Sequence, residues 1–481
     1  MGYVGGVIAF NAVCTAAGYC VLAPALRGLR GLTIATYAGV ALLVGTGLVG
    51  VALCIEAPLG ARVGLVAFFA TAATLSAAGL AAARLLPALV RARPRAAEPP
   101  PSRLADAVAT AAAAGIAVVL VLVLVGGFRS SPWLDDTWYF WLPKGRALDT
   151  VGLDPHLWRP DPSLHMVFGH DYESLYFIRP DNPLWWSGVL NLVMRFVGTI
   201  DMRAVNGEEA FLLVAFVGAL GRLLWGRVRT WLLLPGLLLL LSAPELIRQT
   251  QGGDADVPLA IYLALALLCA LAWLRERDGF ALLLVFAFAA TAIQIKSEGT
   301  LELVLDLAIL SVLAWRARRA LLPLWGAAAL AFATSVPWLV WRADHGVSNV
   351  FSLRNALSPS YLSHHTDLFH GGVRILGDHF TSVREWSLLV VLAVLLGIAV
   401  AVRDRRAVWL APAAFIAFGY AFFVWISWAD PEGAFRLVAS AYRYVTPPIV
   451  LAAVFLPVLA ERIVTPRPKT TGSASASAAT K

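Results

Sequence analysis

Long apolar runs follow one another along almost the whole chain, and they constrain its fold more than any other feature of the sequence. Of the 481 residues, 59% are hydrophobic and 14% are charged, and the mean hydropathy is +0.74. A soluble globular protein carries about 25% charged residues, so the composition excludes that class. Because a membrane span needs about 20 apolar residues, we predict an all-α polytopic membrane protein with about 13 transmembrane helices. The predicted spans are Tyr3–Leu26, Leu32–Cys54, Val63–Leu86, Ala107–Val125, Glu209–Trp225, Trp231–Leu246, Val257–Leu274, Phe280–Ile295, Thr300–Ala314, Leu321–Trp341, Trp386–Val402, Val408–Trp428 and Tyr444–Leu459.

Arginine-rich connections between the spans set the predicted orientation, because Lys and Arg concentrate on the cytoplasmic side of a membrane. With the N-terminus outside, the connections rich in Arg all fall on one side, and the segments 127–208, 344–385 and 430–443 fall on the other. This arrangement requires that Pro183–Val197 does not cross the membrane. We therefore predict an interfacial helix there, with Trp185 and Trp186 at headgroup depth. Usage rich in Arg and Ala but poor in Lys is typical of a bacterial genome of high GC content. The predicted location is therefore a bacterial inner membrane, with the outer segments facing the periplasm or the cell exterior.

Two adjacent carboxylates, Asp135 and Asp136, follow the fourth predicted span and open an aromatic-rich stretch. Carboxylates are costly near hydrocarbon, so we expect this pair to face a polar cavity. Like charges side by side raise the pKa of one carboxyl group, which suits it to act as a base while the other stays ionised. The alternative is that the pair caps a helix that starts near Thr137.

A second acidic pair, Asp254 and Asp256, precedes Pro258 at the start of the seventh predicted span. Asp followed by Pro in the first helical turn is a common helix start, and taken alone this pattern favours capping. The pair lies on the same predicted outer face as Asp135 and Asp136, which makes it a second candidate for the site.

Four charged residues near the outer ends of later spans are candidates for binding a phosphate. Lys296 and Glu298 could form a local ion pair at a tight turn. Alternatively, Lys296 holds a phosphate as a point charge. Arg436 and Arg443 lie at the outer end of the last span, against the positive-inside bias. An anionic lipid headgroup or a phosphate would explain these two arginines, and snorkelling to outer-leaflet phosphates is the alternative.

The outer segments also carry residues of the kinds that bind metals and sugars. In the second segment, the candidate metal ligands are His364, His365, Asp367 and His370. Their spacing is not that of a known closed site, so no cofactor is predicted and a divalent metal ion stays an open alternative. In the first segment, Trp138 and Tyr139 belong either to an interfacial aromatic belt or to a surface that stacks on sugar rings.

Taken in order, these motifs resemble those of the polytopic GT-C glycosyltransferases. The nearest resemblance is to the bacterial relatives of the dolichyl-phosphate-mannose protein mannosyltransferases and of the lipid A aminoarabinose transferase. The motifs are Asp135-Asp136 with a following Trp141-Leu-Pro-Lys144, Arg179-Pro-Asp-Asn-Pro-Leu184, Gly253-Asp-Ala-Asp-Val-Pro-Leu259, Lys296-Ser-Glu-Gly299 and Tyr442-Arg-Tyr-Val-Thr-Pro447. They cover about Pro132 to Pro448. The chain departs from the family pattern in having Asn182 before Pro-Leu, Asp254 after Gly, and Ser297 after Lys. These departures bear on the identity of the donor and the acceptor more than on the class of reaction.

The resemblance implies an inverting glycosyltransferase that takes a sugar from a polyprenyl-phosphate donor and transfers it to a glycan, lipid or protein acceptor outside the cytoplasm. It implies that Asp135 is the general base, and that Asp136 and Asp256 orient the acceptor or hold a divalent ion. The side chains expected at the leaving phosphate are Lys144, Lys296, Glu298, Arg436 and Arg443. The side chains expected at the acceptor or sugar are Trp138, Tyr139 and Asp254.

We expect the chain to divide into a GT-C-like transmembrane catalytic domain, 106–461, and flanking parts. Three N-terminal helices, 1–90, come first, and a Pro- and Arg-rich cytoplasmic linker, 91–105, follows them. The tail, 462–481, is rich in Ser, Thr and Ala and is expected to be disordered. The net charge of +8 fits membrane lipids as partners and calls for no nucleic acid.

A transporter or flippase for a lipid-linked or anionic substrate is the alternative function. Such proteins place charges near the membrane midplane on broken helices and show repeated halves. The charges here gather at one predicted face and the sequence shows no internal repeat, which favours the transferase. A catalytically silent scaffold would leave the outer carboxylates unexplained.

Overall fold

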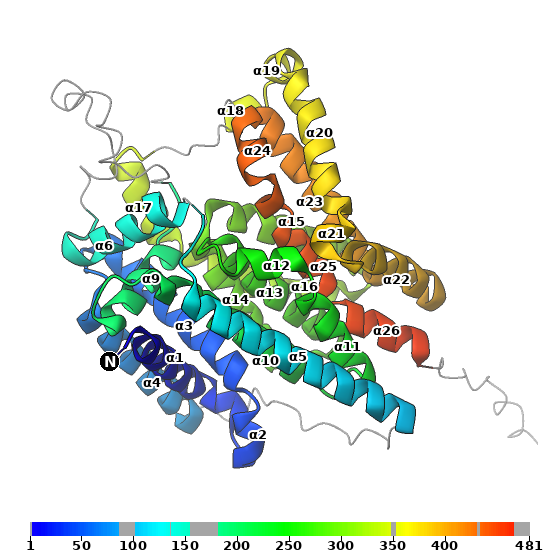
Figure 1. Ribbon diagram of the computed structural model, residues 1–481, viewed down its shortest axis with the longest axis horizontal. Coiled ribbons are helices and arrows are strands. Elements are labelled where there is room, and N and C mark those ends of the chain that lie inside the picture. Colours follow the sequence, from blue (N-terminus) through cyan, green and yellow to red (C-terminus); the bar gives the residue numbers. More distant parts are fainter. Residues whose placement is uncertain are drawn as a thin grey trace, which may run out of the picture.

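The computed structural model is a bundle of helices with further short helices rising from one of its ends (Figure 1). It describes residues 2–85, 102–134, 136–153, 181–347, 353–430 and 433–465. The structure is 84% helical, and the described residues form no strand. Seven of the described helices are long and apolar enough to cross a membrane, or eight if the bent pair Trp315–Ala333 and Val336–Asp344 counts as one span. The chain is therefore an all-α, multi-pass membrane protein.

The first half of the bundle contains most of the long helices. They are α1 (Tyr3–Leu26), α2 (Gly31–Ala35), α3 (Ala38–Glu56), α4 (Leu65–Leu85), α5 (Arg103–Arg129), α6 (Leu142–Thr150), α9 (Trp185–Val197), α10 (Arg203–Leu224), α11 (Thr230–Leu241) and α12 (Pro244–Gln249), with a short π-helical turn, η2 (Thr137–Trp141), before α6.

The second half continues with α13 (Asp256–Glu276), α14 (Gly279–Ile295), α15 (Ser297–Leu313), α16 (Leu321–Ala333), α17 (Val336–Asp344), α18 (Leu353–Ala356), α19 (Pro359–His364), α20 (Thr366–Thr381), α21 (Val383–Trp386), α22 (Leu389–Asp404), α23 (Ala411–Ala429), α24 (Gly433–Tyr444), α25 (Thr446–Ala453) and α26 (Leu456–Val464). Short 3-10 helices precede α16 and α23, at Trp315–Ala320 and Ala407–Leu410.

The prediction of about 13 spans is not confirmed, because several of the predicted segments form helices that are short or charged. Helices α11, α14 and α22 have 12, 17 and 16 residues. Helix α10 is 22 residues long, but Glu208 and Glu209 lie near its start. Helix α15 has 17 residues, among them Glu298, Glu302 and Asp306. Length and composition therefore identify fewer crossing helices than hydropathy along the sequence suggested.

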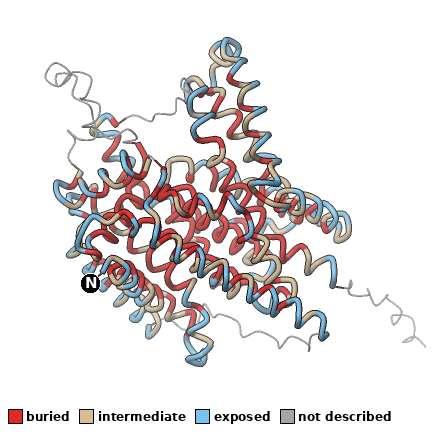
Figure 2. The backbone as a smooth tube through the Cα atoms, viewed as in Figure 1, coloured by how far each residue is buried: buried red, intermediate tan, exposed pale blue. Residues whose placement is uncertain are grey.

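The core of the bundle lies around α13, whose residues are buried almost throughout (Figure 2). Helix α13 packs against α14, α25 and α10, and α14 in turn packs against α16 and α3. The outer helices α4 and α5 expose most of their apolar residues, as helices in contact with lipid do. The first spans are joined to the rest of the bundle by polar contacts as well: Asn11 Nδ2 donates a hydrogen bond to Glu208 Oε2 at 2.6 Å, and the Tyr262 hydroxyl donates one to the Leu43 carbonyl at 2.9 Å.

Helix α9 corrects one prediction about the membrane interface. At 13 residues it is shorter than the roughly 20 residues of a span, but its Trp185 and Trp186 face protein and not lipid headgroups. Both side chains are buried inside the protein, with exposures of 1% and 0%. Their indole nitrogens donate hydrogen bonds to the carbonyls of Gly47 and Gly253, at 3.2 and 3.1 Å. The helix packs against α1, α3 and α6, and eleven of its 13 residues are buried.

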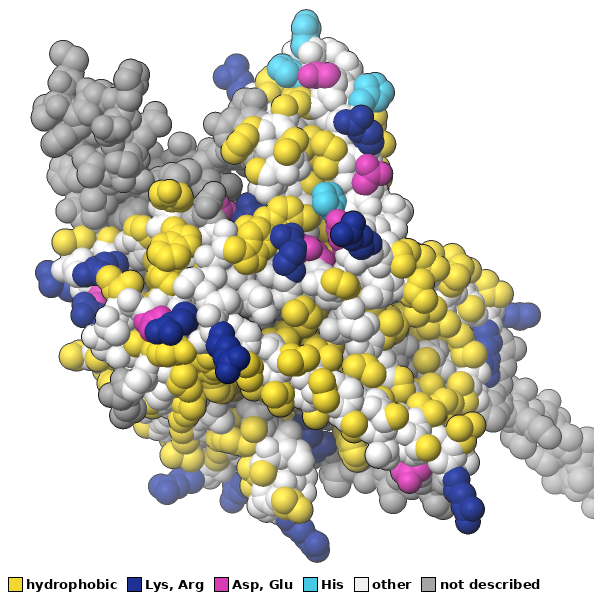
Figure 3. Space-filling view, in the orientation of Figure 1, with side chains coloured by type: hydrophobic (Ala, Val, Ile, Leu, Met, Phe, Trp, Pro, Cys, Tyr) yellow, Lys and Arg dark blue, Asp and Glu magenta, His cyan; other side chains and the backbone are white. Residues whose placement is uncertain are grey.

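The second predicted outer segment forms helices α18 to α21, and α20 packs against α23 and α24 in the part that rises from the bundle (Figure 1). Histidine side chains gather on this part of the surface (Figure 3). The linker and tail predictions lie mostly outside the described residues: α5 begins at Arg103, inside the predicted linker, and α26 ends at Val464, inside the predicted tail.

Candidate functional site

A cluster of ionisable side chains lies where four segments meet at the end of the bundle that carries α18 to α21. These segments are η2, the α12–α13 loop with the start of α13, the α14–α15 junction and α24. They supply Asp136, Asp254, Asp256, Lys296 and Arg443, which come from four of the motifs singled out in the sequence. The cluster therefore joins parts of the chain that are up to 307 residues apart.

Arg443 is the centre of the first half of this cluster. Its Nη1 contacts Asp254 Oδ2 directly and lies 2.5 Å from Asp136 Oδ2, and its Nη2 donates a hydrogen bond to Ser440 Oγ at 2.7 Å. The side chain is only 11% exposed. Arg443 therefore does not snorkel to the membrane surface; it pairs with two carboxylates from distant motifs. Its Nε is buried and has no hydrogen-bond partner among the described residues.

Lys296 and Asp256 form the second half of the cluster. Lys296 Nζ lies 2.8 Å from Asp256 Oδ1, and the two side chains are 11% and 5% exposed. Asp256 Oδ2 is buried and accepts no hydrogen bond from the described residues. One oxygen of this carboxylate is thus held by a cation, while the other is open to a further donor.

Asp254 and Asp256 do not cap α13 in the way the sequence pattern favoured. Ala255 occupies the N-cap position of α13 and no side chain caps that helix. Asp254 Oδ1 instead accepts hydrogen bonds from Trp141 Nε1 at 3.1 Å and from the Ala255 amide at 2.7 Å. Asp136 occupies the N-cap position of η2 without a capping hydrogen bond from its side chain. The carboxylates are therefore used for long-range ion pairs.

Neighbouring charges stabilise the ionised forms of Asp254 and Lys296. Burial alone would raise the pKa of the Asp254 carboxyl group, but the positive charges of Arg443 and Lys296 outweigh burial and hold that pKa well below its usual range. Burial would likewise lower the pKa of the Lys296 ammonium, and the carboxylates of Asp256 and Glu298 raise it above its usual value. Asp254 therefore stays ionised at neutral pH and is unsuited to take up a proton as a base.

A tight loop, Gly252-Gly253, fixes the positions of Asp254 and Asp256. Gly253 has φ of +77°, a conformation that glycine adopts without strain. Its amide donates a hydrogen bond to the buried Glu209 Oε2 at 3.0 Å, and its carbonyl accepts one from Trp186. Thr137 Oγ1 donates a hydrogen bond to the Gly252 carbonyl at 3.0 Å. This loop is therefore held by α10, α9 and η2 together.

The Arg179–Leu184 motif begins outside the described residues, but its second half packs onto the Lys296 motif. Asn182 Oδ1 accepts a hydrogen bond from the Ser297 amide at 3.3 Å, and Ser297 Oγ donates one to the Asp181 carbonyl at 3.2 Å. Lys144 is fully buried, and its Nζ donates to the Asn182 carbonyl at 3.2 Å. Lys144 thus supports the loop that borders the cluster.

A cavity of about 290 Å³ opens between α15, α16, α17 and α23 next to Lys296. Its wall is apolar along Leu301, Phe332 and Leu339 and charged at Asp181, Glu298, Arg342 and Asp430. A cavity with an apolar wall and a few convergent polar groups is the usual form of a ligand site. This one suits a ligand with an apolar part and a charged end.

An aromatic and cationic stack closes the other side of the cluster. The rings of Trp133 and Tyr442 stack with centroids 6.2 Å apart, and the Arg248 guanidinium lies 4.4 Å from the first ring and 4.6 Å from the second. Gln249, at the end of α12, connects to the last helices, because its Nε2 donates to the Tyr442 carbonyl and its Oε1 accepts from Thr446 Oγ1. These contacts hold Arg443 against Asp254.

Several predicted residues lie outside this geometry. Asp135 is outside the described residues, and of Arg436 only its place in α24 is described. Trp138 and Tyr139 are 46% and 66% exposed beside Asp136, and Trp138 donates a hydrogen bond to the Pro132 carbonyl. They are therefore accessible to a ligand.

The metal alternative gains no support from this part of the chain. Among the described residues, no three His, Cys, Asp or Glu side chains are grouped so that they could hold a metal ion. His364 and His365 direct their Nδ1 atoms to the backbone carbonyls of Ser360 and Tyr361. Asp367 and His370 lie in the first turns of α20.

Sequence reasoning missed Glu209, Trp141 and Gln249, although each contacts the cluster or the loop that carries it. Glu209 was placed at the edge of a predicted span, and a glutamate in an apolar segment is itself a signal of a buried polar contact. Gln249 stands at the start of the acidic motif in the sequence, and its polar side chain next to an apolar span was the available clue. Trp141 was noted only as part of a motif.

Comparison of the chain with protein-family models, with curated proteins and with solved structures found no match.

Proposed function

We propose that the chain is a membrane glycosyltransferase that transfers a sugar from a polyprenyl-phosphate donor to an acceptor outside the cytoplasm. The observation that carries the proposal is the cluster of Asp136, Asp254, Asp256, Lys296 and Arg443 beside a cavity with an apolar wall. A polyprenyl-phosphate sugar combines a long apolar tail, an anionic phosphate and a polar sugar. The apolar wall of the cavity suits the tail, the cations Lys296 and Arg443 suit the phosphate, and the carboxylates of the cluster suit the hydroxyls of the sugar.

In the proposed reaction, Asp135 takes the proton of the acceptor hydroxyl or amine. The acceptor forms a new bond to the anomeric carbon while the bond from that carbon to the phosphate oxygen breaks, so that the electron pair leaves with the polyprenyl phosphate. Attack from the face opposite the phosphate inverts the anomeric centre, and no covalent intermediate on the protein is needed. A positioned base accelerates such a step by about 10²–10⁴-fold.

Lys296 and Arg443 are the described cations that can stabilise the departing phosphate, because fixed positive charge in a dry site favours developing negative charge. Lys296 pairs with Asp256, and Arg443 pairs with Asp254 and Asp136. A bound phosphate would compete with these carboxylates for the same cations. Asp256 Oδ2 is buried and accepts no hydrogen bond from the described residues, so it would accept one from a sugar or acceptor hydroxyl that displaced its covering.

The proposal is tested by following the release of polyprenyl phosphate from a panel of polyprenyl-phosphate sugars by purified protein, with Asp135→Asn and Asp256→Asn as variants. Asp201→Asn is the matched control, because Asp201 pairs with Arg203 outside the cluster. We expect wild type and control to release the lipid product, Asp135→Asn to lose about 10²-fold or more of the rate, and Asp256→Asn to weaken donor or acceptor use. Equal rates in all four proteins would refute the assigned roles.

One observation favours the transporter as a second candidate. Glu298, Glu302 and Asp306 follow one another at four-residue spacing along α15, so they lie on one side of the helix, and Glu302 is buried. Ionisable residues in membrane helices often mark ion or proton pathways. Glu302→Gln distinguishes the two candidates: it would abolish proton-coupled movement of substrate across proteoliposomes if the chain is a transporter, and would leave the release of polyprenyl phosphate intact if it is a transferase.

A further inference from the structure

One indole beside the candidate site is exposed although its position is fixed. Trp133 precedes Asp136 by three residues and is 43% exposed. Its Nε1 donates a hydrogen bond to the Arg248 carbonyl at 3.2 Å. The ring also stacks on Tyr442 and contacts the Arg248 guanidinium. A side chain held in this way presents its surface in one orientation, so it loses little conformational freedom when a ligand binds.

These contacts cover only one face of the Trp133 ring. The Arg248 guanidinium lies 4.4 Å from the centre of the Trp133 ring and 4.6 Å from the centre of the Tyr442 ring, whereas the two ring centres are 6.2 Å apart. If Arg248 and Tyr442 lay on opposite faces of the indole, their separation would exceed the distance between the two rings. Both partners therefore lie on the same side of Trp133, and its opposite face is open.

The open face lies close to the charged cluster. Tyr442 is followed in the chain by Arg443, whose guanidinium lies 5.9 Å from the centre of the Tyr442 ring. Two short steps, of 6.2 and 5.9 Å, thus connect the Trp133 ring to the guanidinium that pairs with Asp136 and Asp254. A ligand of the size of a short oligosaccharide can therefore reach both the cluster and the open face of Trp133.

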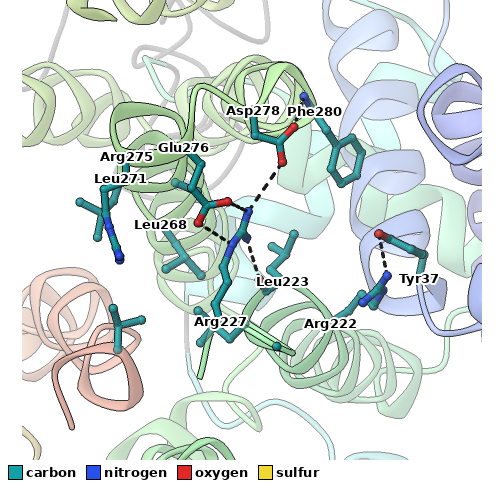
Figure 4. Close-up of a pocket in the computed structure, with 14 residues that line it drawn as sticks. Tyr37, Arg222, Leu223, Arg227, Leu268, Leu271, Arg275, Glu276, Asp278 and Phe280 are labelled. Carbon is teal, nitrogen blue, oxygen red and sulfur yellow. Dashed lines mark hydrogen bonds and ion pairs between the residues drawn. The ribbon is translucent and has the colours of Figure 1, made fainter. Parts of the chain in front are cut away.

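A contact between a cation and a ring does not by itself mark a ligand site. In a cavity of about 360 Å³ at the opposite end of the bundle, the Arg222 guanidinium lies 4.1 Å from the centre of the Tyr37 ring (Figure 4). Tyr37 is only 4% exposed, and its ring also packs against Phe280. The contact between Arg222 and Tyr37 is therefore structural, whereas Trp133 combines such a contact with an accessible face.

Exposure alone does not mark a ligand site either, because tryptophans at a membrane surface are often exposed. Trp315 is 64% exposed, and its side chain makes no hydrogen bond or ring contact with the described residues. It follows the far end of α15, the helix that begins beside Lys296. Trp133 differs from Trp315 because its ring is fixed and adjoins the carboxylates of the candidate site.

We propose that Trp133 is a platform for a sugar ring of the acceptor, and that the acceptor is therefore a glycan. One face of a pyranose ring carries mainly C–H groups. Their weak positive charge is attracted to the negative face of an indole, and the flat contact removes apolar surface of both rings from water. The inference rests on the proposed transferase, because it names the class of acceptor for that reaction.

Binding is tested without turnover, on the full-length protein labelled with fluorotryptophan and reconstituted in nanodiscs. The fluorine resonances of Trp133 and Trp315 are assigned from their loss in Trp133→Phe and Trp315→Phe. The probes are soluble trisaccharides of glucose, of N-acetylglucosamine and of mannose. We expect at least one of them to shift the Trp133 resonance in a saturable manner and to leave the Trp315 resonance unchanged.

The absence of a saturable shift with every trisaccharide would overturn the proposal. A spin-labelled phosphatidylcholine headgroup then identifies the alternative. If it broadens the Trp133 resonance as much as the Trp315 resonance, Trp133 belongs to an interfacial aromatic belt and contacts lipid.

The second comparison measures acceptor use by Trp133→Ala, Trp133→Tyr and Trp315→Ala, with a polyprenyl-phosphate sugar as donor and the glycan that shifts the Trp133 resonance as acceptor. Trp133→Ala should raise the KM for the glycan about tenfold and leave kcat nearly unchanged, because a contact away from the reacting atoms stabilises the ground state and the transition state equally. Trp133→Tyr keeps an aromatic face and should recover most of this loss, and Trp315→Ala should equal wild type.

A fall in kcat with an unchanged KM in Trp133→Ala would show that the ring only supports the fold, and would overturn the proposal. The two proposals can also fail separately. A wild type that binds a glycan but transfers no sugar to it would refute the transferase and leave the sugar-binding surface in place. A wild type that transfers sugar to a lipid or peptide, and binds no glycan, would refute the platform and leave the transferase in place.

Discussion

Removing Arg443 should destabilise the protein, and the magnitude follows from the burial of its partners. In Arg443→Ala, the Asp254 carboxylate, whose side chain is 4% exposed, loses its closest cation. Breaking a buried ion pair by removing one partner costs about 3–5 kcal/mol. Because Lys296 still lowers the pKa of Asp254, we expect a loss at the lower end, about 3 kcal/mol. The Asp136 side chain is 40% exposed, and water screens its pair, so it adds at most about 1 kcal/mol.

The assay is reversible unfolding in mixed micelles, with the fraction of denaturing detergent as the variable. Arg443→Ala should lower the free energy of unfolding by about 3 kcal/mol, and Asp136→Ala should lower it by at most about 1 kcal/mol. Adding Asp254→Asn to Arg443→Ala should restore part of the loss, because the buried charge is removed together with its partner. A loss below about 1 kcal/mol in Arg443→Ala, or no recovery in the double variant, would contradict the structural role of this pair.

The same pair makes stability depend on pH in a defined direction. The folded-state pKa of Asp254 is depressed, so its contribution is fully present above the unfolded-state pKa of about 3.9 and is lost as the pH falls below that value. The difference in unfolding free energy between wild type and Asp254→Asn should therefore be constant from pH 7 to about pH 5 and shrink below pH 4. A difference that grows on acidification would show that Asp254 is protonated in the folded protein.

Three further changes give independent tests. Gly253→Ala should cost about 1–3 kcal/mol, because alanine is strained at φ +77° and its Cβ would lie 2.7 Å from Thr137 Oγ1; a melting temperature equal to that of wild type would contradict this. Lys296→Met should destabilise the protein by about 3 kcal/mol or more, because it leaves the buried Asp256 carboxylate unpaired. The double variant Lys296→Met/Asp256→Asn should lose less stability, because Asp256→Asn removes that buried charge. Denaturation curves of wild type and the two variants provide the comparison. Asn11→Ala should cost about 1–3 kcal/mol, because it removes the hydrogen bond to the buried Glu208; retention of wild-type stability would show that this contact does not matter.

The sequence predicts the apolar spans well where they are long and free of charge. Tyr3–Leu26 was predicted with the bounds that α1 has, and Val257–Leu274 lies within α13. The sequence overestimates the number of spans where charged residues interrupt an apolar run, as in α10 and α15. Hydropathy averaged over a window hides these charges and does not show that a buried glutamate has a specific partner. The sequence did not show that Trp185 and Trp186 are buried in protein, because a Trp-rich amphipathic helix has the same pattern whether its apolar face meets lipid or protein.

The sequence also predicts which residues of the candidate site carry charge, but not how they pair. The two carboxylates in Asp254-Ala-Asp256 have the pattern of a helix cap, and nothing local shows that Arg443, 189 residues later, contacts the first of them. The ion pair between Lys296 and Asp256 was not predicted either, because Glu298 is the nearer partner along the chain. Pairings of this kind depend on tertiary packing, here on the Gly253 loop and on α9 beneath it.

The most direct test of the proposed function is a double-label assay in proteoliposomes, with one label on the sugar and another on the polyprenyl chain of the donor. The transferase account predicts that wild type releases polyprenyl phosphate in a 1:1 ratio to the sugar that appears on the acceptor, with inversion at the anomeric carbon. Movement of the intact donor across the membrane, with both labels still joined, would contradict it and identify a transporter.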